Sequence, residues 1–249
     1  MLSLLDTDLI LMRAATSSET EIDWGEDNVW SLYMDMEDAK ASVRQQIDTI
    51  CKAVETDNFI CCLTDPNANF RKVVDPEYKS NRRKNRKPVG YKALFEWVKD
   101  EYPSAMRPQL EADDVMSIIQ TAPHNKGQTI IVSSDKDMKT VPGSLYDPGK
   151  DEFHDISEAS AFEFFLTQVL AGDPVDNIRG IPGIGPVKAK AILGSRPSWG
   201  AVEQAYIKAG MTREDAIKQA RLVRILHHSD WDEKKETVRL WQPSDTKNT

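Results

Sequence analysis

The sequence lacks any long hydrophobic run. None of its apolar stretches approaches the roughly 18 residues that a membrane-spanning helix requires. Residues 1–6 also lack the basic flank and cleavage site of a secretory signal peptide. Since 40% of the 249 residues are hydrophobic and 29% are charged, we expect a cytoplasmic protein with one large domain or two small ones.

Cysteine and histidine are scarce. The three cysteines, Cys51, Cys61 and Cys62, have no metal-ligand spacing, and their odd number argues against a disulfide framework. We therefore expect them to be buried thiols. The four histidines lie apart from the acidic clusters of the chain, which disfavours zinc chemistry and histidine-dependent nucleases.

Positive charge is in the minority, because 32 Lys and Arg residues face 40 Asp and Glu residues and the formal net charge is −8. The distribution is nevertheless uneven. Residues 79–92 contain seven basic and no acidic side chains, which is compatible with binding a polyanion beside a metal-filled acidic cleft. These basic residues are Lys79, Arg82, Arg83, Lys84, Arg86, Lys87 and Lys92.

Nine carboxylates fall in five short clusters, each where an α/β pattern would place the end of a strand or the start of a helix. Carboxylates gathered in one cleft repel each other and would take up protons unless divalent cations compensate them. Two Mg²⁺ ions, for which Mn²⁺ could substitute, would equip such a cleft to hydrolyse a phosphodiester. The predicted metal ligands are Asp6, Asp65, Glu111, Asp113, Asp114, Asp135, Asp137, Asp173 and Asp176.

Three short apolar runs, residues 2–5, 59–64 and 129–133, are predicted strands, and an aspartate comes after each of them. In parallel α/β sheets the functional edge lies at the carboxyl ends of the strands. We therefore expect these three aspartates to converge on one edge.

Helical patterns account for most of the remaining chain. A short helix is predicted from Asp8 to about Ala15, and one long amphipathic helix is predicted over residues 28–55. After about residue 157 the strand signals fade. The predicted helices there cover residues 159–171, 186–193, 199–208 and 212–228.

Some of the acidic clusters also have simpler interpretations. Glu111, Asp113 and Asp114 precede a predicted helix, whose dipole favours acids in its first turn by up to about 1 kcal/mol. Capping explains one or two of these acids more readily than three. Asp135 and Asp137 could occupy a surface turn, so this cluster gains weight only together with its neighbours.

The stretch from 172 to 194 is the most specific in the chain. Its glycines permit a tight hairpin with exposed backbone amides, and Pro186 suits the first turn of the next helix. Such a hairpin can bind a DNA phosphate without reading bases, whereas a plain helix–helix turn would explain only one glycine. The expected phosphate contacts are Gly180, Gly183, Gly185, Lys188 and Lys190.

The basic segment could be a solvated loop, which is the usual interpretation of a charge run. Two residues of the stretch from Tyr78 to Lys87 suggest more. Tyr78 could stack on a splayed base, and Lys79 could reach a scissile phosphate if the segment packs beside Asp65.

Together these motifs resemble the 5′-nuclease superfamily of flap endonucleases and 5′→3′ exonucleases, most closely its small bacteriophage members. Their order and rough spacing agree with that family. The motifs are Leu-Leu-Asp at 4–6, Leu-Thr-Asp at 63–65, Asp-Pro-Glu-Tyr-Lys-Ser-Asn-Arg at 75–82, Leu-Glu-Ala-Asp-Asp at 110–114, Ser-Asp-Lys-Asp at 134–137 and the glycine-rich hairpin at 172–194.

The resemblance implies a PIN-like α/β nuclease domain over residues 1–156, with a central, mostly parallel sheet and a basic, arch-like segment at about 79–102. It implies a helical region over residues 157–249 whose helix-3-turn-helix module holds the duplex and binds K⁺ at its carbonyls. Thr7 departs from the glycine that many relatives have, and the segment from Arg82 to Tyr102 is short for a closed arch.

The resemblance also divides the acids between two metal sites and assigns the basic residues. Lys79 and Arg82 would engage the reacting phosphate, and Asp65, Asp113 and Asp135 would be the central catalytic carboxylates. The first site would contain Asp65, Glu111 and Asp113, with Asp6 and Asp114 close by, and the second Asp135, Asp137, Asp173 and Asp176. The expected DNA contacts of the basic segment are Tyr78, Lys79, Arg82, Arg83, Lys84, Arg86 and Lys87.

The function implied is hydrolysis of double-stranded DNA from or near 5′ ends, nicks or flaps by a monomer, with RNA–DNA hybrids carrying 5′ primers as further substrates. One alternative is a restriction-type nuclease using Asp65, Glu77 and Lys79, which leaves the other acids and the hairpin unexplained. The others are a non-catalytic DNA-binding module and a PIN-domain ribonuclease, although such ribonucleases are usually much smaller.

Overall fold

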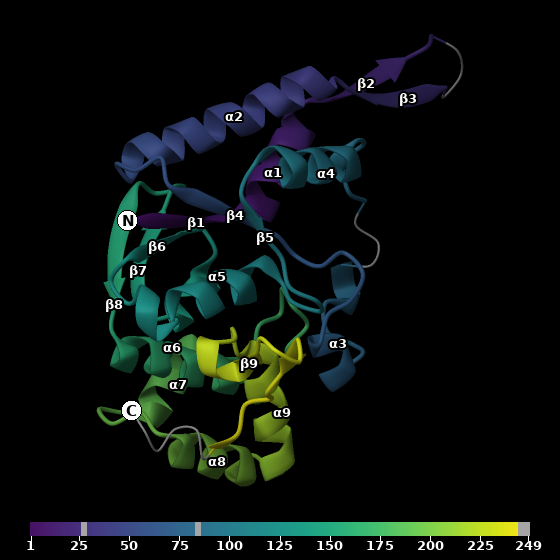
Figure 1. Cartoon of the computed structure of the whole chain (residues 1–249). Helices are drawn as coiled ribbons and strands as arrows, with labels where there is room; N and C mark the ends of the chain where they lie inside the picture. The colour runs from purple at the N-terminus through teal and green to yellow at the C-terminus, as the bar shows by residue number, and fades with distance from the viewer. Residues whose placement is uncertain (26–28, 83–85, 244–249) are drawn as a thin grey trace.

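The computed structural model describes residues 1–25, 29–82 and 86–243 (Figure 1). A six-stranded sheet with strand order β5-β4-β1-β6-β7-β8 forms its centre, and all neighbouring pairs are parallel except β7 and β8. The prediction of an α/β fold with a mostly parallel sheet is confirmed. The strands are β1 (Leu2–Asp6), β4 (Phe59–Cys62), β5 (Ser104–Ala105), β6 (Thr129–Val132), β7 (Gly143–Asp147) and β8 (Glu152–Ile156).

The carboxyl ends of β1, β4 and β6 lie at the same edge of the sheet. β1 pairs in parallel with β4 on one side and with β6 on the other, so that Asp6 faces Cys62 and Leu5 faces Val132. The loops after these strands therefore leave the sheet together, as the sequence predicts.

Helices cover both faces of the sheet. Leu5 and Cys61 pack in a core with α1 (Thr7–Ser17), α2 (Met36–Ala53) and α4 (Tyr91–Glu101) on one face. Leu4 and Cys62 point to the other face, where α5 (Ala112–Gln120) and α6 (Glu158–Ala171) pack (Figure 1). All three cysteines are buried and free, as predicted.

The prediction of one helix over residues 28–55 is wrong at its start. Residues Trp30–Met34 form β3, which pairs in antiparallel register with β2 (Glu19–Asp23), and α2 begins only at Met36. Asp35 sets this start, because its side chain accepts hydrogen bonds from the Glu37 and Asp38 amides. The β2–β3 hairpin projects from the N-terminal end of α2, away from the sheet (Figure 1).

The second half of the chain is mainly helical. α7 (Pro186–Leu193) and α8 (Trp199–Lys208) have the predicted bounds, whereas α9 (Arg213–Val223) ends earlier than the predicted residue 228. Within residues 1–25, 29–82 and 86–243, no helix is long and apolar enough to cross a bilayer. The remaining elements are α3 (Arg71–Val74), β9 (Trp231–Asp232), β10 (Thr237–Val238) and the 3₁₀-helices η1 (Ser80–Arg82), η2 (Pro123–Asn125), η3 (Lys136–Thr140) and η4 (His228–Asp230).

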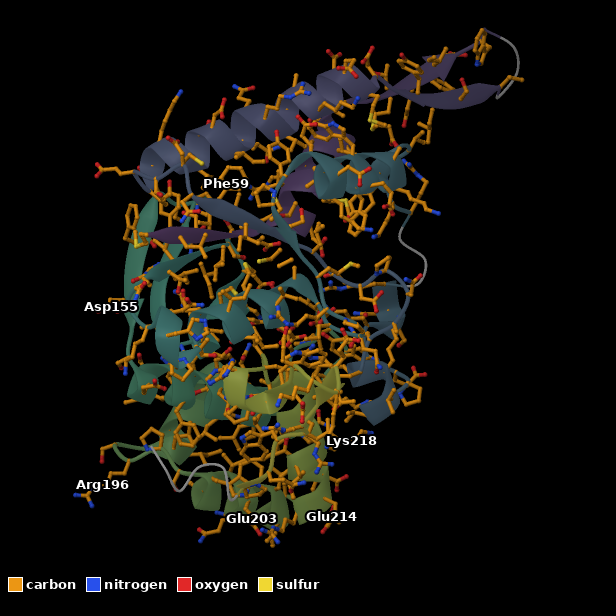
Figure 2. The ribbon with its side chains drawn as sticks, in the orientation of Figure 1. Phe59, Asp155, Arg196, Glu203, Glu214 and Lys218 are labelled. Carbon is orange, nitrogen blue, oxygen red and sulfur yellow. The ribbon has the colours of Figure 1, made fainter. Side chains whose placement is uncertain are left out.

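The helical region contacts the residues that precede the basic segment. Lys218 of α9, labelled in Figure 2, forms an ion pair with Asp75 at 2.6 Å. Tyr78 belongs to the same hydrophobic core as Phe165, Tyr206 and Trp241. The expected boundary near residue 156 falls between β8 and α6, but side chains from both sides of it share this core.

Gly172 and Gly180 bring two backbone segments into direct contact after α6. A Cβ atom on Gly180 would lie 2.3 Å from the Gly172 nitrogen, and one on Gly172 would lie 2.4 Å from the Ile178 oxygen. Both residues also have positive φ angles, of 71° for Gly172 and 58° for Gly180. The loop between them carries Asp173 and Asp176, so these two glycines fix the position of two predicted ligands.

We expect Gly180→Ala to lower the free energy of unfolding by more than about 2 kcal/mol, because overpacking and the positive φ angle both oppose a side chain. Thermal and urea unfolding measure this. Gly185→Ala is the control, because no atom of the described residues comes within 4 Å of a Cβ built there, and its effect should stay within about 0.5 kcal/mol. Equal effects of the two substitutions would contradict the close approach.

Candidate active site

Six of the nine predicted acids line one cleft of about 100 Å³ at the carboxyl edge of the sheet. The start of α5, the loop after β6 and the loop after α6 supply them, and Lys79, Arg82 and Lys136 lie among them. The fold thus gathers residues that are far apart in the sequence. The six acids are Glu111, Asp113, Asp135, Asp137, Asp173 and Asp176.

Glu111 is held as an anion at the start of α5. It is the N-cap of this helix, and its carboxylate accepts hydrogen bonds from Lys79 at 2.5 Å, from Arg71 at 3.3 Å and from the Tyr78 hydroxyl at 2.9 Å. Burial alone would raise the pKa of Glu111, but Lys79 and Arg71 lower it to about 2. A carboxylate in this environment stays ionised.

Asp113, only two residues further on, has the opposite environment. Burial and the nearby carboxylates of Asp6, Asp135 and Glu111 raise the pKa of Asp113 well above its usual value. Burial, with added repulsion from Asp8 and Asp135, likewise raises the pKa of Asp6 to about 6, although Ser133 donates a hydrogen bond to Asp6 at 2.7 Å. These carboxylates are close enough to oppose each other's ionisation.

η3 carries another such carboxylate. Asp135 caps η3 by accepting a hydrogen bond from the Asp137 amide at 2.8 Å, and both residues line the cleft. Burial and the charge of Asp135 raise the pKa of Asp137 to about 6, against the opposing effects of Lys136 and a hydrogen bond from Gln168.

The loop after α6 supplies the last two acids. Asp173 accepts a hydrogen bond from the Val175 amide at 2.8 Å and pairs with Lys136 at 2.8 Å. Asp176 pairs with Arg82 at 2.5 Å and with Lys79 at 3.6 Å. Basic side chains thus occupy the space beside both carboxylates.

Three predicted ligands, Asp6, Asp65 and Asp114, do not line this cleft. Asp6 lies close enough to Asp113 to raise its pKa, whereas Asp65 and Asp114 are bound to other groups. The Asp65 oxygens accept hydrogen bonds from the Asn67 and Gln109 amides, and these bonds lower its pKa although burial opposes them. Asp114 is fully buried and binds Arg71 through both oxygens, at 2.7 and 2.8 Å. In this structure both residues shape the surroundings of the cleft instead of lining it.

Sequence reasoning missed Arg71. Its guanidinium contacts Asp114 and Glu111 and also donates to the carbonyls of Leu222 and Arg224, at the end of α9. A single buried arginine between Phe70 and Val73 gave no periodic signal that would distinguish it from a surface residue.

Asp8 was also overlooked as a member of the site. The sequence predicts that Asp8 caps the first helix, but Asp6 is the N-cap and Asp8 lies in the first turn. Burial raises the pKa of Asp8, and a hydrogen bond from Thr64 together with the charge of Lys87 opposes this shift. Asp8 therefore adds to the negative charge around Asp6.

The structure corrects the expectations for the basic segment. Tyr78 is 3% exposed, and its hydroxyl donates to Glu111, so the ring is packed inside the protein instead of being free to stack on a base. Arg86 forms a two-pronged ion pair with Glu19 of the projecting hairpin, at 2.8 and 2.6 Å. The predicted contacts Arg83 and Lys84 lie outside the described residues.

One part of the glycine-rich hairpin is exposed to solvent and another part is buried. Gly183 and Gly185 are accessible, as are Lys188 and Lys190 of α7, and the Lys188 amine donates to the Gly183 carbonyl at 3.0 Å. Gly180, in contrast, is buried against Gly172. Four of the five expected phosphate contacts are therefore accessible.

The donor set of the cleft suits hard divalent cations by its chemistry. Within residues 1–25, 29–82 and 86–243, no three His, Cys, Asp or Glu side chains are already arranged as a metal-binding group, because lysine and arginine side chains separate several of the carboxylates. The raised pKa values of Asp6, Asp113 and Asp137 nevertheless show carboxylates that lack compensation. Mg²⁺ or Mn²⁺ would supply it.

Comparison with known sequences connects this fold to nucleases. Residues 28–152 match the family described as the 5′-3′ exonuclease N-terminal resolvase-like domain. The exodeoxyribonuclease of Enterobacteria phage T3 is 29% identical over 96% of this chain and 92% of its own length, and the exonuclease of Escherichia phage T7 gives the same three figures. The flap endonuclease Xni of Shewanella oneidensis is 31% identical, over 50% of this chain and 52% of its own length.

A solved structure has the same fold. The D15 protein of T5, co-crystallised with metal ions, superimposes with a TM-score of 0.66 over 90% of this chain and 89% of its own, at 19% identity. The similarity therefore covers both the α/β part and the helical part of the chain.

Asp113 and Asp114 are adjacent but should respond to substitution in opposite ways. Asp114→Asn leaves Arg71 buried without its ion-pair partner and should cost about 3 to 5 kcal/mol of unfolding free energy. Asp113→Asn should leave stability unchanged or raise it near neutral pH, because a carboxylate with a raised pKa opposes folding once ionised. Urea unfolding in EDTA measures both, and equal losses would contradict the assigned environments.

Proposed function

Because this chain belongs to the 5′-3′ exonuclease family, we propose that its acidic cleft binds two divalent metal ions and hydrolyses DNA phosphodiesters at or near 5′ ends. The chain is a 5′-nuclease with phage-type relatives. The observation that carries the proposal is the cleft itself, which six carboxylates from three segments line together with Lys79.

The metal ligands we propose are the six cleft acids together with Asp6, which is coupled electrostatically to Asp113. When bound, Mg²⁺ or Mn²⁺ would lower the pKa of a water molecule and stabilise negative charge on the phosphate. The other two predicted ligands, Asp65 and Asp114, bind backbone amides and Arg71 in this structure. We assign these two a supporting role beside the cleft, which they do not line.

Lys79 would provide a fixed positive charge for the reacting phosphate. Burial would lower the pKa of this amine, but Glu111 and Asp176 outweigh that effect and raise it, so the amine stays protonated. Its contact with Glu111 directs it into the cleft. Arg82, which is paired with Asp176, would be the second basic contact.

Duplex binding would use the exposed glycine-rich hairpin and the basic segment. Gly183, Gly185 and the start of α7 present a backbone turn beside Lys188 and Lys190, which suits a phosphate and not a base edge. We propose that double-stranded DNA is the substrate and that RNA–DNA hybrids are also cleaved. We further propose that K⁺ binds at the hairpin carbonyls. The active form would be a monomer composed of a nuclease region, 1–156, and a helical region, 157–249.

Exonuclease action on duplex ends is the first candidate, since the T3 and T7 relatives named as exonucleases match 96% of this chain, whereas the match to the S. oneidensis flap endonuclease covers 50%. The segment between Arg82 and Tyr102 is also short for an arch that encloses a threaded flap. Flap cleavage is the second candidate.

We expect 5′-labelled blunt duplex incubated with Mg²⁺ to release mononucleotides, and nicked duplex to be degraded from the nick. A single oligonucleotide released from flapped DNA would instead identify a flap endonuclease.

Asp135→Asn should lower the cleavage rate by at least about 100-fold, while DNA binding remains. The matched control is Asp155→Asn on β8 (Figure 2), which lies outside the cleft and should keep full activity.

Failure of the wild type to cleave any of these DNAs with Mg²⁺ or Mn²⁺ would overturn the proposal and favour a non-catalytic DNA-binding module. Wild-type turnover by Asp135→Asn would remove this residue from the mechanism.

We expect Lys79→Ala to slow single-turnover cleavage by about 100- to 1,000-fold, while DNA affinity falls by less than about tenfold because one phosphate contact among several is lost. Equal losses would make Lys79 a phosphate anchor only. Glu77→Gln is the control that distinguishes the proposed mechanism from the restriction-type alternative, because only that alternative requires Glu77. Glu77 is exposed and accepts a hydrogen bond from Ser80 at 3.1 Å, so its substitution should have little effect.

A further inference from the structure

Lys79 and Asn177 share an unusual backbone conformation. Their φ angles are 53° and 59°, in the left-handed region that residues other than glycine seldom adopt. For a lysine this conformation costs on the order of 1 to 2 kcal/mol, and it persists only where the surroundings impose it. The contacts of the two turns show what imposes it.

The turn that carries Lys79 and the turn that carries Asn177 are bound to each other in both directions. The Lys79 amide donates to the Asp176 carbonyl at 2.9 Å. The Asn177 side-chain amide donates to the Glu77 carbonyl at 2.7 Å and to the Ser80 hydroxyl at 3.1 Å. The Asn177 bonds thus hold the residues on either side of Lys79.

A second set of bonds continues this contact beyond Lys79. The Asn81 side-chain amide donates to the Pro174 and Val175 carbonyls at 3.1 and 3.2 Å. The Arg82 guanidinium donates to the Val175 carbonyl at 3.2 Å as well as to Asp176. Residues nearly a hundred positions apart in the sequence are therefore joined next to the cleft.

We infer that Asn177 is a positioning residue for the reaction, which holds the Lys79 turn in its left-handed form so that the amine lies between Glu111 and Asp176. The inference rests on the proposed role of Lys79. Asn177 is partly buried and its amide faces the Lys79 turn. Without those two bonds the turn can relax to an ordinary conformation, and the amine leaves the cleft.

The same contact also fixes the position of Lys79 relative to Asp176. Asp176 supplies both the carbonyl that binds the Lys79 backbone and the carboxylate 3.6 Å from the Lys79 amine. Asn177 thereby sets the distance between a phosphate contact and one proposed metal ligand, a geometry to which cleavage rates are steeply sensitive.

A merely structural asparagine is the competing interpretation, because asparagine tolerates the left-handed region better than most residues. Asn177→Gly separates the two interpretations, since glycine keeps that backbone conformation freely and removes only the side-chain amide. The discriminating measurement is a double-mutant cycle with Lys79→Ala, using single-turnover cleavage of 5′-labelled duplex with Mg²⁺.

We expect Asn177→Gly to slow cleavage by about 10- to 100-fold in the wild-type background and by less than about threefold in the Lys79→Ala background, where there is no amine left to position. DNA affinity should change by less than about threefold. The control, Asn125→Ala, removes a 2.9 Å bond to the Ile119 carbonyl at the opposite edge of the sheet and should leave the rate unchanged.

Equal losses from Asn177→Gly in both backgrounds would overturn the inference, as would a wild-type rate for Asn177→Gly. If Asn177→Gly does not fold, the exposed Asn81→Ala is carried through the same cycle with the same expectation. An inactive wild type would instead refute the proposed function, and a fully active Lys79→Ala would refute the role of Lys79, so that the failures remain distinguishable.

Discussion

The buried ion pair between Arg71 and Asp114 is the interaction on which the rest of the site depends. Arg71 is 3% exposed and Asp114 is fully buried, so neither charge can return to water without exposing the other. The same guanidinium contacts Glu111 and two carbonyls at the end of α9. Since burying these charges is costly unless every bond is made, α3, the start of α5 and the end of α9 are held in one arrangement.

This arrangement gives two neighbouring carboxylates opposite properties. Glu111 lies beside Arg71, Lys79 and the Tyr78 hydroxyl, and its pKa falls to about 2. Asp113 lies on the other side of the helix start, among the carboxylates of Asp6 and Asp135, and its pKa rises. The cleft therefore combines a permanent anion, which orients the lysine, with carboxylates whose charge only an added cation can balance.

Sequence patterns predicted the features that strand direction determines and failed where tertiary packing decides. Asp6 and Asp135 come after apolar runs, and parallel strands bring such residues to one edge whatever the details. Asp114, Tyr78 and Gly180 belong to motifs that fit the same chemistry, but their side chains or backbone face Arg71, the helical core and Gly172. The spacing of apolar residues alone also did not distinguish β3 from the start of the predicted helix, because the apolar pattern of Trp30–Met34 suits a strand as well as a helix.

The projecting β2–β3 hairpin has a consequence for how this molecule can vary. Its alignment is set by its own five cross-strand pairs, and its base is tied to the main body where Glu19 accepts hydrogen bonds from Arg86 and the Val89 amide. A change in the length of the connection between Asp23 and Trp30 would leave these five pairs and the Glu19 contacts in place, so that the positions of α1 and α2 do not depend on that length.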